Sequence, residues 1–138
     1  MALLREHTAH SGWSSACVAA GMGKPDVLRL LASSGADLNA PDSHGRSPVY
    51  RAARRGHTEC LQVLATAGCD MNASDELEGC PPAYYAAMDG NVGVLRALFQ
   101  AGADLGKANV TGETPLSVAL RCKRTAAANY LQHQLPTH

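Results

Sequence analysis

Two short helices are predicted by the pattern of apolar and polar residues between Asp42 and Ser74. The first runs from Pro48 to about Arg55, and the second from about Thr58 to Thr66. The second helix carries apolar residues on one broad face, as a buried helix does: Cys60, Leu61, Val63 and Leu64. Isolated helices below about 12–15 residues are marginal in water. These helices therefore need packing against neighbouring units.

Turn and capping residues mark where the helices begin and end. The segment Asp42 to Gly45 has the composition of a β-turn, and Ser47 followed by Pro48 is a typical helix start. Gly56 ends the first helix where a left-handed cap is expected, and Gly68 ends the second. The predicted unit is a turn followed by two antiparallel helices.

A Gly-Ala/Cys-Asp tripeptide recurs along the chain at a nearly fixed interval. It begins at Gly35, Gly68 and Gly102, which are 33 and 34 residues apart. A second set of glycines keeps the same spacing: Gly12, Gly45, Gly79 and Gly112. Such a period indicates a stacked array of one supersecondary unit. The usual product of such an array is an extended binding surface.

Residues 42–59, DSHGRSPVYRAARRGHTE, resemble the ankyrin repeat, with its 33-residue period and T-P-L-H-x-A core. The resemblance extends from about Gly12 to Leu131. It implies an all-α ankyrin-repeat solenoid of stacked helix-turn-helix units with β-turn or hairpin fingers. The repeats would occupy about 9–41, 42–74, 75–108 and 109–138, with 1–11 as an irregular N-terminal cap. Residues 1–138 would then form a single ankyrin-repeat domain.

Two departures from the ankyrin pattern affect the fingers. The histidine of T-P-L-H is replaced in every unit, by Cys17, Tyr50, Tyr84 and Ser117. That histidine ties the turn to neighbouring backbone in the family, so the rigidity of the fingers is in question, although a tyrosine hydroxyl could substitute. The third unit has one extra residue between Asp75 and Gly79, and its Pro81 lacks a capping hydroxyl. The insertion either contacts a partner or is a tolerated surface change.

Charge and cysteine content exclude several classes of function. The chain has 12 basic and 12 acidic residues, so no net field favours nucleic acid or an anionic membrane. No apolar run approaches the roughly 20 residues of a membrane span, and the first residues do not resemble a secretory signal. Five cysteines without a C-x-x-C pair indicate free thiols in the cytoplasm or nucleus. No metal or cofactor is expected.

The resemblance implies that the finger tips and the exposed side of the first helices line one concave surface. Its candidate partner-binding residues, carried over by position, are Trp13, Met22, Ser43, His44, Arg46, Arg54, Arg55, Glu76, Leu77, Glu78, Tyr85, Met88, Asp89 and Arg121. One hypothesis is that Arg46, Arg54 and Arg55 bind an acidic stretch of a partner while the apolar members anchor it. The alternative is that these arginines pair with carboxylates of the third unit and contribute little.

A protein-binding module is the leading interpretation, acting as a scaffold, adaptor or inhibitor and as a monomer, without catalysis. Within that class, the chain resembles small kinase-inhibiting ankyrin proteins in length, or it is a fragment of a larger ankyrin adaptor. A cysteine-dependent enzyme is the remote alternative, because no set of nucleophile, base and orienting acid is evident. Cys60 is expected to face the core, whereas Cys80 and Cys122 are expected to be exposed.

Overall fold

The computed structural model describes residues 14–134 of the 138-residue chain. Trp13 and the predicted cap at residues 1–11 lie outside the described residues. Between residues 14 and 134 the chain forms helices in successive pairs: α2 (Ser15–Gly21) with α3 (Pro25–Ser33), α4 (Pro48–Arg55) with α5 (Thr58–Thr66), α6 (Pro82–Asp89) with α7 (Val92–Gln100), and α8 (Pro115–Arg121) with α9 (Thr125–Gln134). The helices predicted at Pro48–Arg55 and Thr58–Thr66 are confirmed.

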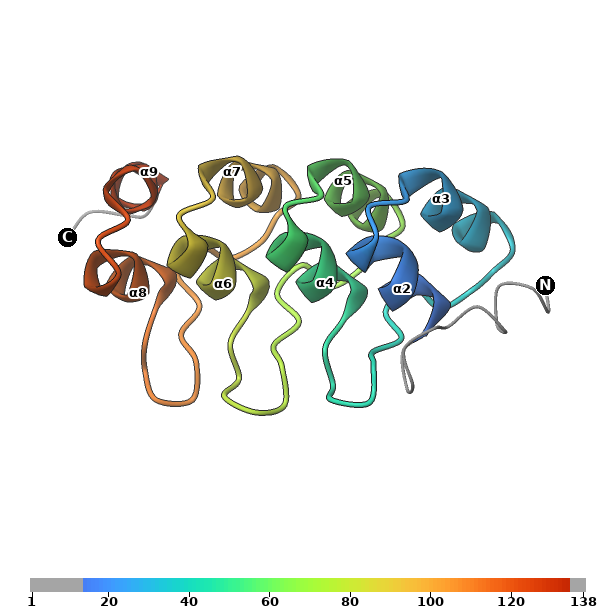
Figure 1. Cartoon of the computed structure of the whole chain (residues 1–138), viewed down its shortest axis with the longest axis horizontal. Helices are drawn as coiled ribbons and strands as arrows, with labels where there is room; N and C mark the ends of the chain where they lie inside the picture. Colours follow the sequence, from blue (N-terminus) through green and yellow to red (C-terminus); the bar gives the residue numbers. More distant parts are fainter. Residues whose placement is uncertain (1–13, 135–138) are drawn as a thin grey trace.

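The helix pairs stack side by side in two rows (Figure 1). We call α2, α4, α6 and α8 the inner helices, and α3, α5, α7 and α9 the outer helices. Loops at residues 40–47, 73–81 and 107–114 project from the inner row as the first, second and third fingers. Each finger is closed by a backbone hydrogen bond, such as the 2.9 Å bond from Asp42 N–H to Arg46 C=O. Because residues 14–134 contain no strand, the predicted all-α ankyrin-repeat solenoid is confirmed.

Side-chain caps begin most of the inner helices. The hydroxyls of Ser14, Ser47 and Thr114 each accept a hydrogen bond from a backbone N–H of the first turn. The residue that precedes α6 is Pro81, which offers no such acceptor, as the sequence predicts. At the other end of α4, Gly56 adopts the left-handed conformation with φ 76°. Local sequence signals therefore fix the lengths of these helices.

One hydrophobic core runs through the whole stack. The inner helices meet through small side chains, and Ala52, Ala86 and Ala119 are each 0% exposed. The outer helices fill the space behind them with larger residues, including the fully buried Leu61 and Leu95. Burial of one such leucine stabilises the fold by about 1.5–3 kcal/mol. None of the helices within residues 14–134 is long and apolar enough to cross a membrane.

Candidate protein-binding surface

The candidate site is the surface formed by the finger tips and the exposed sides of the inner helices, which we call the inner face. Its shape depends on how each finger is held against the helix that follows it. The three fingers lead directly into α4, α6 and α8 (Figure 1). The candidate partner-binding residues were predicted to lie on this surface from the resemblance to ankyrin repeats.

A buried carboxylate or amide at the base of each finger holds its backbone. The Oδ1 atom of Asp42 accepts hydrogen bonds from the N–H groups of His44 at 2.8 Å and Arg46 at 2.9 Å. Asp75 accepts in the same way from Glu78 and Cys80, and Asn109 from Thr111 and Glu113. We call these three residues the finger anchors. They hold the finger backbone, a role that the sequence analysis had considered only for a histidine or a tyrosine. Their regular placement three residues or more before a finger glycine was an available signal.

The second oxygen of each anchoring aspartate binds a side chain of the next inner helix. The guanidinium of Arg51 donates a hydrogen bond to Asp42 Oδ2, and the hydroxyl of Tyr85 donates one to Asp75 Oδ2. The Asp42 carboxylate is 0% exposed and forms an ion pair with Arg51. Each contact joins a finger to the helix that follows it. The fingers are therefore fixed without the family histidine.

These contacts set the protonation of the finger anchors. Burial alone would raise the pKa of Asp42, but backbone N–H donors and the Arg51 guanidinium outweigh it and hold that pKa below its usual value. At Asp75, burial alone would likewise raise the pKa. Hydrogen bonds from the Tyr85 hydroxyl and from backbone N–H groups outweigh burial, so the pKa of Asp75 is also lowered. Burial and the bond to Asp75 raise the pKa of Tyr85. Asp42 and Asp75 are thus charged at neutral pH, and Tyr85 is a neutral hydroxyl that donates a hydrogen bond.

Arginine and tyrosine side chains form a connected layer across the middle of the inner face. The rings of Tyr50 and Tyr85 meet edge to face with centroids 4.9 Å apart, and Tyr85 meets Tyr84 at 5.5 Å. The guanidinium of Arg54 lies 4.8 Å from the centre of the Tyr85 ring, and that of Arg46 lies 5.4 Å from the centre of Tyr50. This packing orients both arginines before any partner is present.

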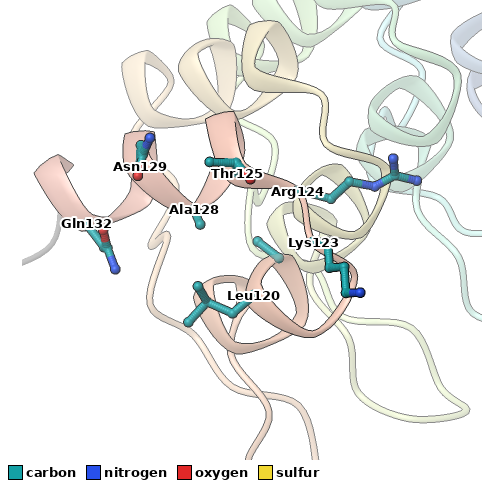
Figure 2. A pocket seen from close by; sticks show the side chains of 8 residues that line it. Leu120, Lys123, Arg124, Thr125, Ala128, Asn129 and Gln132 are labelled. Carbon is teal, nitrogen blue, oxygen red and sulfur yellow. The ribbon is translucent and has the colours of Figure 1, made fainter.

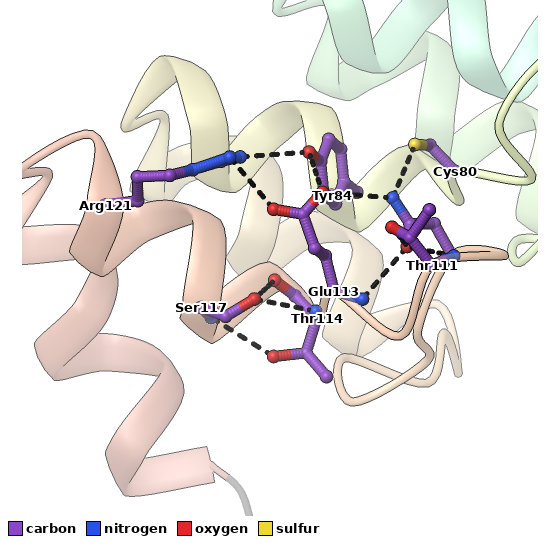
Figure 3. Close-up of polar contacts among 8 residues, drawn as sticks. Cys80, Tyr84, Thr111, Glu113, Thr114, Ser117 and Arg121 are labelled. Atoms are coloured by element: carbon purple, nitrogen blue, oxygen red, sulfur yellow. Dashed lines mark hydrogen bonds and ion pairs between the residues drawn. The ribbon is translucent and has the colours of Figure 1, made fainter.

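Tyr84, which packs against Tyr85, connects this layer to the third finger (Figure 3). Its hydroxyl donates to Glu113 Oε1 at 3.4 Å and accepts from Arg121 Nη2 at 3.3 Å. Arg121 also forms an ion pair with Glu113, with Nη1 and Oε2 2.9 Å apart. At the position of the family histidine, Tyr84 therefore supplies a hydroxyl whose partners are the side chains of Glu113 and Arg121 rather than neighbouring backbone.

Most of the predicted binding residues reach the surface. Those exposed are Met22, Ser43, His44, Arg55, Glu76, Leu77, Glu78, Asp89 and Arg121, and those half-buried are Arg46, Arg54, Tyr85 and Met88. Among the apolar ones, Leu77 is 69% exposed and Met22 is 59% exposed. Trp13 is outside the described residues. Predicted residues at positions from α2 to α8 are therefore accessible to solvent.

The arginines of the second unit are not equally available. Arg54 Nη1 lies 3.4 Å from Asp89 Oδ2, so the internal pairing with a carboxylate of the third unit is present at this position. Arg51 is held at Asp42. Arg55 is exposed and forms no ion pair with any residue of the 14–134 segment. Arg55 is therefore the most accessible cation among them.

The cysteines divide into buried and exposed groups, and one prediction about them was wrong. Cys80 is 1% exposed rather than exposed, because it turns inward from the second finger and accepts a hydrogen bond from Asn109 Nδ2 at 3.5 Å. Cys60 is buried and Cys122 is exposed, as predicted. Burial raises the pKa of the thiols that are buried: Cys17, Cys60, Cys69 and Cys80. Within residues 14–134, no cluster of His, Cys, Asp or Glu could hold a metal ion.

Stacked helix pairs with projecting fingers define the class of helical-repeat solenoids. Within that class, the family model described as ankyrin repeats (3 copies) matches residues 2–75 and 67–136 of this chain. The protein therefore belongs to the ankyrin-repeat family. A comparison with curated proteins finds no match.

Proposed function

We propose that this ankyrin-repeat protein binds a partner protein through its inner face, as a scaffold, adaptor or inhibitor. Ankyrin repeats are generally protein–protein interaction modules. The single observation that carries the proposal is the layer in which Arg54 lies 4.8 Å from the Tyr85 ring, beside exposed Arg55. Arginine and tyrosine are enriched among the residues that dominate binding energy. A layer already held in one conformation loses little entropy on binding.

The chemistry of the inner face favours an acidic stretch in the partner. Arg46, Arg54 and Arg55 belong to the second unit, and within residues 14–134 only Arg54 among them has a carboxylate partner, Asp89. In this proposal Arg55 is the main contact for the partner's carboxylates, because it is exposed and forms no ion pair within residues 14–134. The remaining predicted residues, from Met22 to Arg121 and including Trp13, line the surface on which the partner lies.

The buried thiols weigh against the cysteine-dependent enzyme. A thiolate is the reactive nucleophile, and burial raises the pKa of four cysteines away from that state. Free buried thiols suit the reducing cytoplasm or nucleus, where we place the protein. We propose that it acts as a monomer. A kinase-inhibitor role and an adaptor role both remain compatible with the inner face.

A three-bait affinity experiment tests the proposed inner-face site. The baits are the wild-type protein, the inner-face variant R55E/L77A, and a control variant, Q62A/Q100A, changed at exposed residues of the outer helices. A partner is expected to bind the wild type and the control but to bind R55E/L77A at least about tenfold more weakly by calorimetry. Its affinity should also fall with salt. Equal affinity for all three baits would overturn the proposal.

A further inference from the structure

The exposed end of the stack carries an open hollow between α8 and α9 (Figure 2). Its volume is about 370 Å³. One face of α9 lines it, with residues spaced as i, i+3, i+4 and i+7: Thr125, Ala128, Asn129 and Gln132. Leu120 of α8 also lines it and is 55% exposed. The opposite side of α9 is covered, because the outer helix α7 of the preceding unit packs against it. We call the uncovered surface on α8 and α9 the end groove.

Small residues in α9 create the hollow. Ala128 stands where α3, α5 and α7 carry Leu28, Leu61 and Leu95, each of which is 0% exposed. Those leucines fill the space between their own helix and its neighbours. Ala128 leaves that volume empty beside the exposed Leu120. The end groove therefore has room for an aliphatic side chain supplied from outside.

Two substitutions make the end groove unsuitable for a further ankyrin repeat. At the junction between helices, Gly23, Gly56 and Gly90 each lie against a residue of the next unit, and a Cβ on Gly90 would be 2.9 Å from Cδ of Arg124. The last unit has Lys123 at this position, still in the left-handed conformation with φ 61°. Leu120 likewise replaces Ala87, which is 0% exposed under the next unit. A repeat stacked in the usual register would collide with both side chains.

The charge around the end groove is uniformly positive. From Thr114 onward the chain contains Arg121, Lys123 and Arg124 but no aspartate or glutamate. Arg121 is paired with Glu113, whereas the side chain of Lys123 makes no hydrogen bond or ion pair within residues 14–134. The side chain of Arg124 donates its Nε–H to the carbonyl oxygen of Met88, in the preceding unit, at 3.0 Å. Lys123 therefore lies at one end of the hollow without a carboxylate partner within residues 14–134, whereas the Arg124 side chain points away toward the preceding unit (Figure 2).

We propose that the end groove is a second docking site, separate from the inner face, for an acidic amphipathic helix of a partner protein. An aliphatic side chain of that helix fills the hollow between Leu120 and Ala128. Its carboxylates bind Lys123, and its polar edge meets Asn129 and Gln132. A free helix, unlike a repeat, can shift along α9 to accommodate Leu120. Shape selects a helix, and charge selects an acidic one.

Binding of fluorescent model peptides tests this site directly. The probes are three amphipathic helices of about 18 residues, or five turns, which share a leucine face. Their polar faces are built from glutamate with glutamine, lysine with glutamine, or glutamine alone. We expect the acidic peptide to bind the wild-type protein and to bind L120A/K123E at least about tenfold more weakly by anisotropy. The inner-face variant R55E/L77A should bind it as the wild type does.

Nuclear magnetic resonance locates the bound peptide and makes the result independent of variant folding. Amide shifts on titration of the wild-type protein should centre on residues 120–132. Several outcomes would overturn the proposal: no binding of the acidic peptide up to about 1 mM, equal binding of the lysine peptide, or loss of binding in R55E/L77A. Displacement of the acidic peptide by single-stranded DNA, with the same shifts, would reassign the end groove to nucleic acid.

Discussion

The finger anchors Asp42, Asp75 and Asn109 are the residues on which the inner face most depends. Each accepts at least two backbone hydrogen bonds within its own finger. The two aspartates add a bond to Arg51 or Tyr85 of the next inner helix. Buried polar groups of this kind are costly to leave without partners. Loss of one helix contact should therefore weaken the fold without changing its topology.

Replacing Tyr85 with phenylalanine removes one donor from the buried Asp75 carboxylate. We expect Y85F to lower the free energy of unfolding by about 1.5–3 kcal/mol, because a hydrogen bond to a charged group is lost. The matched control is Y130F, since the Tyr130 ring packs beside Arg96 and its hydroxyl has no hydrogen-bond partner in the described part of the chain. Urea unfolding measures both. Equal midpoints for the two variants would contradict the anchoring role of Tyr85.

Acid should destabilise the protein through the same anchors. The folded pKa values of Asp42 and Asp75 lie below their usual value, so their stabilisation is fully present above about pH 4–5. It is lost as the pH falls through those lowered values, because the unfolded chain then binds more protons. D42N removes one of these titrations, so its free energy of unfolding should fall less steeply with acid, although it is less stable at neutral pH. Parallel slopes for D42N and the wild type would refute this.

Residue-scale predictions from the sequence succeeded at surface positions and failed at Cys80. Position within the repeat placed Arg55 and Leu77 at the surface, where they are. Cys80 was assigned by the same logic, but it packs against Asn109 of the following finger. The finger anchors were missed because their partners, Arg51 and Tyr85, differ in chemistry from one unit to the next. The anchors themselves recur at the repeat spacing, but the side chains that bind them do not repeat, so their role is not evident from a single sequence.

At the scale of helices, proline and glycine determine where each element begins and ends. Pro48 opens α4 and Gly56 closes it, and the sequence predicted both boundaries for this local reason. The same signals predict where the repeats are divided, and that division stays a prediction. The junction between α8 and α9 is the exception, because a lysine occupies the left-handed position of a glycine.

Lys123 should be a source of strain between α8 and α9. Its φ of 61° is unfavourable for a residue with a Cβ, so K123G is expected to stabilise the protein by about 0.5–1 kcal/mol, after allowing for the freer unfolded chain. K24G is the matched control, since Lys24 has φ −111° and gains no relief. Thermal and urea unfolding would show opposite signs for the two changes. A loss of stability in both variants would argue against strain at Lys123.

At the scale of the whole molecule, residues 14–134 form a linear array, in which the helices of each unit pack on those of the neighbouring units. Inner helices pack α2 on α4, α4 on α6 and α6 on α8, and the outer helices follow the same order. The sequence predicted this arrangement from its period, because the period fixes the spacing of buried residues. It could not predict the hollow at the end groove, which depends on how Ala128 and Leu120 leave one surface uncovered. Position along the array should therefore control how far a local defect spreads.

Two leucines with the same burial and different positions test this linear coupling. Leu95 on α7 and Leu131 on α9 are both 0% exposed, and replacing either with alanine removes about 2–5 kcal/mol of packing. L95A interrupts the middle of the array, so it should lower the protection of amides on both sides in hydrogen exchange. L131A affects the last pair, so exchange should rise in α8 and α9 while α4 and α5 stay protected. If L131A exposed α4 and α5 as much as L95A does, the array would instead unfold as one indivisible unit. In that case the inner face and the end groove would be coupled through global stability, because a ligand on either surface would protect every helix equally.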